Sequence, residues 1–213
     1  MACNFRAAMP RHLIPLATAL TLAFALPAAQ AEKADRLKPF VFTQDKLGRV
    51  DAVNQRTELL GNVVVTKGSL LLKAEKVDFQ ETKDGYHQAF ATGAPGQPVT
   101  FRQARDIPGE SIDGVANQLE YDTRTETVRF VGNATVRRLR GASVAEEVSG
   151  AVIVYNSRTE VFTLEAGSAS PNPNGRTRIV MMPRVQPGDE AASAPAAPLP
   201  LKPSTTLQPG KPS

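Results

Sequence analysis

The feature that most constrains the fold is an alternation of apolar and polar residues on either side of a short polar turn, within residues 61–79. In the second run, residues 70, 72 and 74 are apolar, whereas the opposite face carries Lys73 and Glu75. A period of two is typical of a β-strand with one buried and one solvated face. The two runs and the turn at residues 66–69 therefore predict a β-hairpin.

Related segments recur along the chain. Residues 119–130 align with residues 153–164 at an offset of 34 (158 − 124), with their apolar positions in phase. The triplet Arg56-Thr57-Glu58 lies at twice that offset, 68 residues (124 − 56), and Gly132-Asn133 echoes Gly61-Asn62. A degenerate repeat of this kind predicts strand–turn–strand units that stack and bury one continuous core.

Short strands separated by Gly, Pro, Asn and Asp turns are expected between about residues 40 and 182. The predicted strands are residues 50–53, 58–66, 69–79, 88–91, 99–104, 110–113, 118–122, 126–131, 134–139, 148–155, 160–165 and 177–182. Outside the first 31 residues no stretch has a sustained helical period. This pattern predicts an all-β domain, as a sandwich, a jelly roll or a β-solenoid.

Both ends of the chain are expected to lie outside this domain. A basic start, an apolar run at residues 13–26 and Ala29-Gln30-Ala31 predict a signal peptide over residues 1–31, with Glu32 as the mature N-terminus. Residues 185–213 are rich in Pro and Ala and are expected to be a disordered tail, which leaves 32–184 as the domain. The only cysteine, Cys3, lies in the leader. We therefore expect an exported protein without disulfides, most simply in the periplasm.

Few residues are suited to catalysis or metal binding. His87 is the only histidine after the leader, so a Ser-His-Asp triad would have to use it, and a metal site would need other ligands. Carboxylates fall mainly on solvated strand faces or in turns, and the chain has no tryptophan on which a sugar could stack. There is no dense basic stripe with aromatic residues that would indicate nucleic-acid binding. The sequence thus predicts no catalytic residue, no metal site and no cofactor.

The remaining candidate site is the apolar face of the strands. This face is either an ordinary packed core or a greasy groove for lipid chains, and periodicity gives the same alternation for both. The candidate groove residues are Val63, Val65, Leu70, Leu72, Phe79, Phe90, Val99, Phe101, Ile112, Leu119, Tyr121, Phe130, Val136 and Tyr155.

Several segments resemble the OstA-like family: residues 61–77, 96–103, 110–121 and 131–136 follow its pattern in order, within a similarity over about residues 37–182. The resemblance implies a semi-open, twisted antiparallel β-jelly roll whose interior holds the acyl chains of lipopolysaccharide. It implies no catalysis. The implied role is a periplasmic bridge that carries lipopolysaccharide from the inner to the outer membrane during outer-membrane assembly.

The resemblance also implies partners. Copies would associate head to tail, or join the like-folded β-jelly-roll domains of an inner-membrane (LptC-like) and an outer-membrane (LptD-like) protein. The joints would be unpaired edge strands, which we expect near residues 40–53 and 160–182. Two other functions stay open from the residues alone: a carbohydrate-active enzyme on a β-fold, and an exported adaptor that pairs strands without binding lipid.

Overall fold

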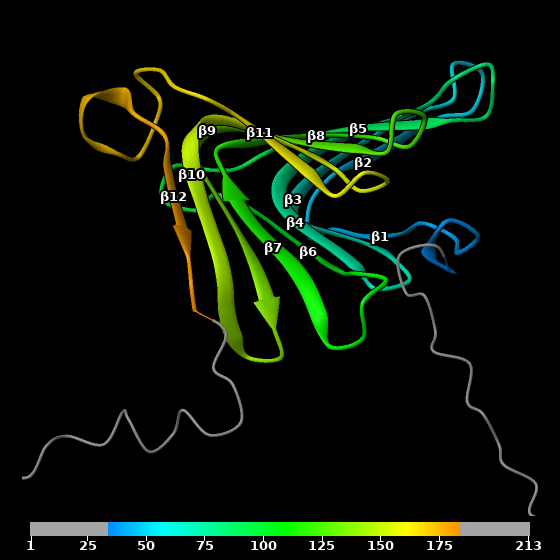
Figure 1. The fold of residues 1–213 in the computed structure, drawn as a ribbon. Coiled ribbons are helices and arrows are strands. Elements are labelled where there is room, and N and C mark those ends of the chain that lie inside the picture. The colour runs from blue at the N-terminus through cyan, green and yellow to red at the C-terminus, as the bar shows by residue number, and fades with distance from the viewer. Residues whose placement is uncertain (1–33, 184–213) are drawn as a thin grey trace, which may run out of the picture.

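The computed structural model describes residues 34–183 (Figure 1). The predicted signal peptide, the Glu32 terminus and the predicted tail lie outside the described residues. Within them, twelve strands form one antiparallel sheet, and a 3₁₀ turn, η1 (Pro173–Gly175), lies between the last two strands. The strands are β1 (Val41–Thr43), β2 (Gly48–Asp51), β3 (Arg56–Lys67), β4 (Leu70–Glu81), β5 (His87–Thr92), β6 (Val99–Ala104), β7 (Glu110–Ala116), β8 (Gln118–Asp122), β9 (Thr127–Arg140), β10 (Ser143–Asn156), β11 (Val161–Glu165) and β12 (Arg178–Met181). The predicted all-β fold is confirmed.

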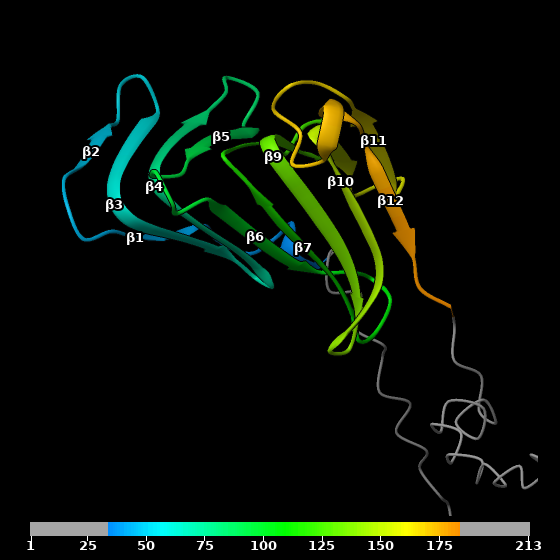
Figure 2. The same ribbon diagram turned by 90° about the vertical axis from the view of Figure 1, so that its left-hand side faces the viewer.

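The sheet folds back on itself into two facing layers because its four longest strands, β3, β4, β9 and β10, each run through both (Figures 1 and 2). Layer A contains β2, β5, β8 and β11, which pair with one half of the long strands. Layer B contains β1, β6, β7 and β12, which pair with the other half. The alternating apolar side chains point between the layers and form the core. This arrangement is the predicted antiparallel jelly roll.

Two Gly-Asn pairs mark where the long strands bend from one layer to the other. Gly61 and Asn62 in β3 have φ of 83° and 44°, and the register shifts between Leu60 and Val63. Gly132 and Asn133 in β9 have φ of 77° and 48°. Glycine and asparagine are the residues that adopt a left-handed backbone most readily, so the echoed pair supplies the bulge that each bend needs.

The predicted internal repeat is present, but the predicted offset of 68 residues is wrong. Asp51, Asp122 and Asn156 each begin a turn of the same length and accept backbone hydrogen bonds from residues two or three positions later. Asp51 and Asp122 are 71 residues apart (122 − 51), as are Gly61 and Gly132 (132 − 61). The offset of 68 came from aligning the Arg-Thr-Glu triplets. The unit that repeats is the capped turn, and Arg56 lies after that turn as the first residue of β3.

Strand boundaries differ from prediction in several places; β10, for example, begins at Ser143 rather than at residue 148, and β7 ends at Ala116 rather than at residue 113. The predicted strand at residues 50–53 lies at 48–51, because Val53 falls in the turn that Asp51 caps. The predicted strands at 126–131 and 134–139 are one bent strand, β9. The short strand β1 was not predicted, and Asp35 in the segment before it is buried.

The sheet ends in strands with one neighbour each. β1 and β2 pair only with β3, and β11 and β12 pair only with β10, so the described chain has the two expected edges. In the part of the chain that the structure describes, no helix has the length and apolar character needed to cross a membrane.

Candidate functional site

The interior between the layers contains all but one of the predicted groove residues. Phe101 and Phe130 meet edge to face at its centre, with ring centroids 5.7 Å apart. The ring of Phe130 lies directly against Gly114, which offers no side chain of its own. The other predicted groove residues also lie on the inner face. Tyr121 is partly buried, and the rest are buried: Val63, Val65, Leu70, Leu72, Phe79, Val99, Ile112, Leu119, Val136 and Tyr155. The centre of the interior is therefore a packed core.

Phe90 is the exception, and its assignment to the groove is wrong. Its side chain is 48% exposed on the outer face of β5, where it lies with Glu120 and Arg129. The inward positions of β5 are Ala89 and Ala91, and Ala89 is the cross-strand partner of Phe79. The small inward residues of β5 leave room for the Phe79 ring. The buried face of β5 is therefore the one that carries the alanines, and the larger Phe90 side chain points outward.

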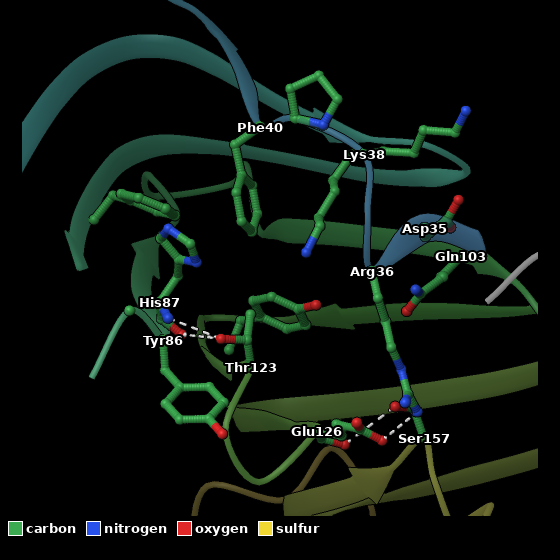
Figure 3. A pocket seen from close by; sticks show the side chains of 15 residues that line it. Asp35, Arg36, Lys38, Phe40, Tyr86, His87, Gln103, Thr123, Glu126 and Ser157 are labelled. Carbon is green, nitrogen blue, oxygen red and sulfur yellow. Dashed lines mark hydrogen bonds and ion pairs between the residues drawn. The ribbon is translucent and has the colours of Figure 1, made fainter. Parts of the chain in front are cut away.

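Empty space lies along the mouth of the jelly roll, where the free rims of the two layers face each other. The larger space, which we call the N-terminal cavity, has a volume of about 510 Å³ and is bounded by residues 35–40 and by β3, β4, β5, β6 and β8 (Figure 3). Its apolar wall includes Phe40 and Phe79, whose ring centroids are 4.9 Å apart, and Tyr121. His87 stacks on the same wall, 5.2 Å from Phe79.

The segment before β1 crosses this mouth and is fastened to both layers. Asp35 accepts hydrogen bonds from the backbone N–H of Ser69 at 3.0 Å and from its hydroxyl at 2.5 Å, at the β3–β4 turn of layer B. Arg36 donates to Glu126 at 2.7 Å, at the β8–β9 turn of layer A (Figure 3). Arg158 binds the same carboxylate at 2.9 Å. The carboxylates of Asp35 and Glu126 are thus both held by hydrogen bonds within the protein.

Lys67 is the most unusual polar residue of the N-terminal cavity. Lys67 is only 8% exposed, and its ammonium lies 4.6 Å from the centroid of the Phe40 ring. Among residues 34–183, no carboxylate oxygen lies within 4.0 Å of this ammonium. Burial lowers the pKa of Lys67, which the charge of Asp35 opposes and that of Arg36 favours.

A second space, the C-terminal cavity, lies between β10, β11 and β12 and has a volume of about 380 Å³. Tyr155, Phe162 and Leu164 form its apolar side. Its polar side is a buried ion cluster in which Arg105 binds both Glu110 and Glu160. Because Arg105 follows β6 in layer B and Glu160 lies in the β10–β11 turn of layer A, this pair also joins the two rims.

The described residues offer little for catalysis. Burial lowers the pKa of His87, which favours the neutral ring, and its nearest carboxylate, on Glu81, is 3.9 Å away. No group of three or more His, Cys, Asp or Glu side chains within residues 34–183 is placed to hold a metal ion. Sequence reasoning missed Lys67 and the Asp35–Ser69 contact, since neither a lone lysine nor the polar segment before β1 carries a periodic signal.

Comparison with known proteins identifies the likeness. A family model described as "LptA/(LptD N-terminal domain) LPS transport protein" matches residues 45–161. The lipopolysaccharide export system protein LptA of Haemophilus influenzae is 30% identical over 159 residues, covering 75% of this chain and 84% of that protein. LptA of Escherichia coli K12 is also 30% identical, over 142 residues, covering 63% and 68% respectively.

The fold has a solved counterpart. The crystal structure of LptH, described as the LptA homologous periplasmic component of the lipopolysaccharide transport device of Pseudomonas aeruginosa, superposes with a TM-score of 0.60. It is 22% identical in sequence and covers 70% of this chain and 99% of that chain. This likeness concerns the jelly-roll architecture.

Proposed function

The chain belongs to the LptA/LptD N-terminal-domain family of lipopolysaccharide transport proteins, and from this premise we propose that it is a periplasmic bridge that carries lipopolysaccharide from the inner to the outer membrane. The observation that carries the proposal is the apolar interior between two layers that meet at a mouth with open cavities. The acyl chains of lipid A would enter between the layers from the mouth, where the two cavities leave space, and would part the packed apolar side chains further in; the sugars would stay at the mouth.

Physical chemistry supports this arrangement. Exposing each methylene of an acyl chain to water costs about 0.8 kcal/mol, so a lipid with several chains does not cross an aqueous space unaided. An interior lined by Val, Leu, Ile and Phe replaces water along the path. The role is that of a carrier: the curated relatives are named as export proteins, and the bridge function requires no catalytic group.

The two edges are the proposed joints. Within residues 34–183, β1 and β2 at one end and β11 and β12 at the other have backbone groups without a strand partner. Another copy can continue the sheet there, which gives head-to-tail chains because the contact joins unlike edges. The same edges suit like-folded domains of LptC-like inner-membrane and LptD-like outer-membrane partners. We place the mature protein in the periplasm after removal of residues 1–31; an exported protein whose sequenced N-terminus precedes Glu32 would contradict that processing.

The direct test is mass spectrometry of lipid that co-purifies with the chain exported to the periplasm of a lipopolysaccharide-producing host. We expect lipopolysaccharide bound to folded protein, and its loss when the preparation is washed with an excess of purified lipid A. Protein that is folded and pairs with like-folded domains, yet carries and binds no lipopolysaccharide, would instead be the structural adaptor.

A further inference from the structure

The N-terminal cavity joins an aromatic wall to a buried cation whose ammonium lies 4.6 Å from the centroid of the Phe40 ring. Lys67 is 8% exposed, and among residues 34–183 it has no carboxylate within 4.0 Å. A buried ammonium of this kind is costly, because burial disfavours the charged form unless an anion compensates it. Aliphatic burial alone would be served better by Leu or Met at this position.

The other charged groups of the cavity do not supply the missing anion. The charge of Asp35 acts on Lys67 from a distance, but Asp35 is held by the backbone and hydroxyl of Ser69 and forms no ion pair with the ammonium. Glu126 is shared by Arg36 and Arg158, so this triad has one excess positive charge. Lys38 also lines the cavity. The mouth of the N-terminal cavity is therefore electropositive, above an interior that is apolar.

The geometry points to a headgroup site: we propose that the N-terminal cavity binds an anionic phosphoryl group on the saccharide of an amphiphile, with Lys67 as its direct cation and Arg36 beside it. Phe40 and Phe79 would pack against the sugar ring or the first methylenes, and the acyl chains would continue between the layers. Gln103, which lines the same cavity, is a further neutral donor (Figure 3). This inference rests on the proposed function, which supplies the acyl chains, but it assigns a separate part of the lipid to separate residues.

The cavity suits such a group for a chemical reason. A phosphoryl oxygen accepts charge-assisted hydrogen bonds, which are about twice as strong as neutral ones. A Lys ammonium in a site of low polarity gains more from that anion than it would in water. Binding the phosphoryl group would thus compensate the buried charge, whereas a neutral sugar would leave it uncompensated.

The test compares bisphosphorylated lipid A with the same lipid after removal of both phosphates, each titrated into the full mature chain. We expect the wild-type protein to bind the phosphorylated lipid on the order of tenfold more tightly. Lys67→Met keeps the aliphatic stem and removes the charge, so it should lose this preference and keep the affinity for the dephosphorylated lipid. Lys73→Met is the matched control, since Lys73 lies on the outer face of β4.

The outcomes are separable. If Lys67→Met is folded by circular dichroism and still prefers the phosphorylated lipid as the wild type does, the headgroup site is wrong while the bridge function stands. If wild-type protein binds neither lipid, the proposed function itself fails. A second arm uses inorganic phosphate alone: if the wild type shows no preference between the two lipids, yet phosphate raises its melting temperature and not that of Lys67→Met, the site belongs to free phosphate and the headgroup assignment is overturned.

Discussion

Gly114 provides the sharpest test of whether the centre of the jelly roll is closed. It lies on β7, and a β-carbon added there would meet Cζ of Phe130 at 2.5 Å, with Cε1 closer still. Real contacts of this kind lie near 3.4–4 Å, so the ring would have to move by about 1 Å. Phe130 is fully buried and is backed by Phe101, which leaves the ring little space into which to move.

Gly114→Ala should therefore destabilise the protein. Overpacking of a well-packed core costs about 1–3 kcal/mol, and the enclosed ring places this site near the upper end of that range. The loss of backbone freedom in the unfolded chain returns about 0.4–1 kcal/mol. A net loss of about 2 kcal/mol should lower the melting temperature by roughly 4–8 °C for a domain of this size. The chain has no tryptophan, so far-ultraviolet circular dichroism is the suitable probe.

Two controls isolate the cause. Gly48→Ala lies on the edge strand β2, where the close neighbour is the flexible amide end of Gln44, so its effect should stay within about 0.5 kcal/mol. Phe130→Leu removes the ring that the new methyl would strike, so adding Gly114→Ala to that background should cost much less than in the wild type. An equal cost in both backgrounds, or a Gly114→Ala variant as stable as the wild type, would refute a close-packed centre.

Three other changes test neighbouring parts of the account. Phe101→Asp places a carboxylate in the packed centre and should abolish cooperative folding; a variant that melts as the wild type does and only loses lipid would mean that water reaches this position. Asp122 is partly buried, which raises its pKa, but hydrogen bonds from Gln88 and the turn backbone outweigh this and lower it. Its stabilisation is therefore present above about pH 4 and lost as pH falls through the lowered value. Asp122→Ala should melt lower than wild type at pH 7, and the difference should shrink near pH 2; an undiminished difference would rule out the carboxylate as the cause. If copies join head to tail, the mass measured by light scattering should rise with protein concentration, and Ile179→Pro, which removes a donor from the edge strand β12, should prevent that rise; unchanged association would place the joint elsewhere.

The sequence predicted the architecture well because a period of two is enforced by burial along every strand. It located both edges and the faces of nearly all core residues, since a one-residue slip would turn each apolar side chain into water. Phe90 shows where hydrophobic periodicity alone fails to predict the buried face of a strand. When a strand alternates small and large apolar residues, the phase is set by what lies opposite, and the partner Phe79 is known only from the pairing.

The internal repeat shows a second limit. The Arg-Thr-Glu triplets drew attention because they are identical, but the structure repeats a capped turn and a Gly-Asn bulge 71 residues apart (132 − 61). Periodicity also could not separate an open groove from a packed core. That distinction depends on Gly114 admitting the Phe130 ring, and on residues 35–40 crossing the mouth, which are contacts between segments far apart in the chain.

The side-chain contacts at the two ends of the mouth are built alike, and this bears on where a lipid enters. The layers are joined covalently at their bends through β3, β4, β9 and β10, whereas their rims are held by side chains. At the N-terminal cavity the joining pair is Arg36 with Glu126, whose side chains are 49% and 12% exposed, and Arg158 stays bound to Glu126 when Arg36 leaves. At the C-terminal cavity the pair is Arg105 with Glu160, whose side chains are 5% and 39% exposed, and Glu110 stays bound to Arg105 when Glu160 leaves. Each contact therefore releases its exposed partner to water and leaves its buried partner paired, so the mouth can widen at either cavity without isolating a buried charge. Of the two cavities, the N-terminal one also offers a cation, Lys67, to a headgroup.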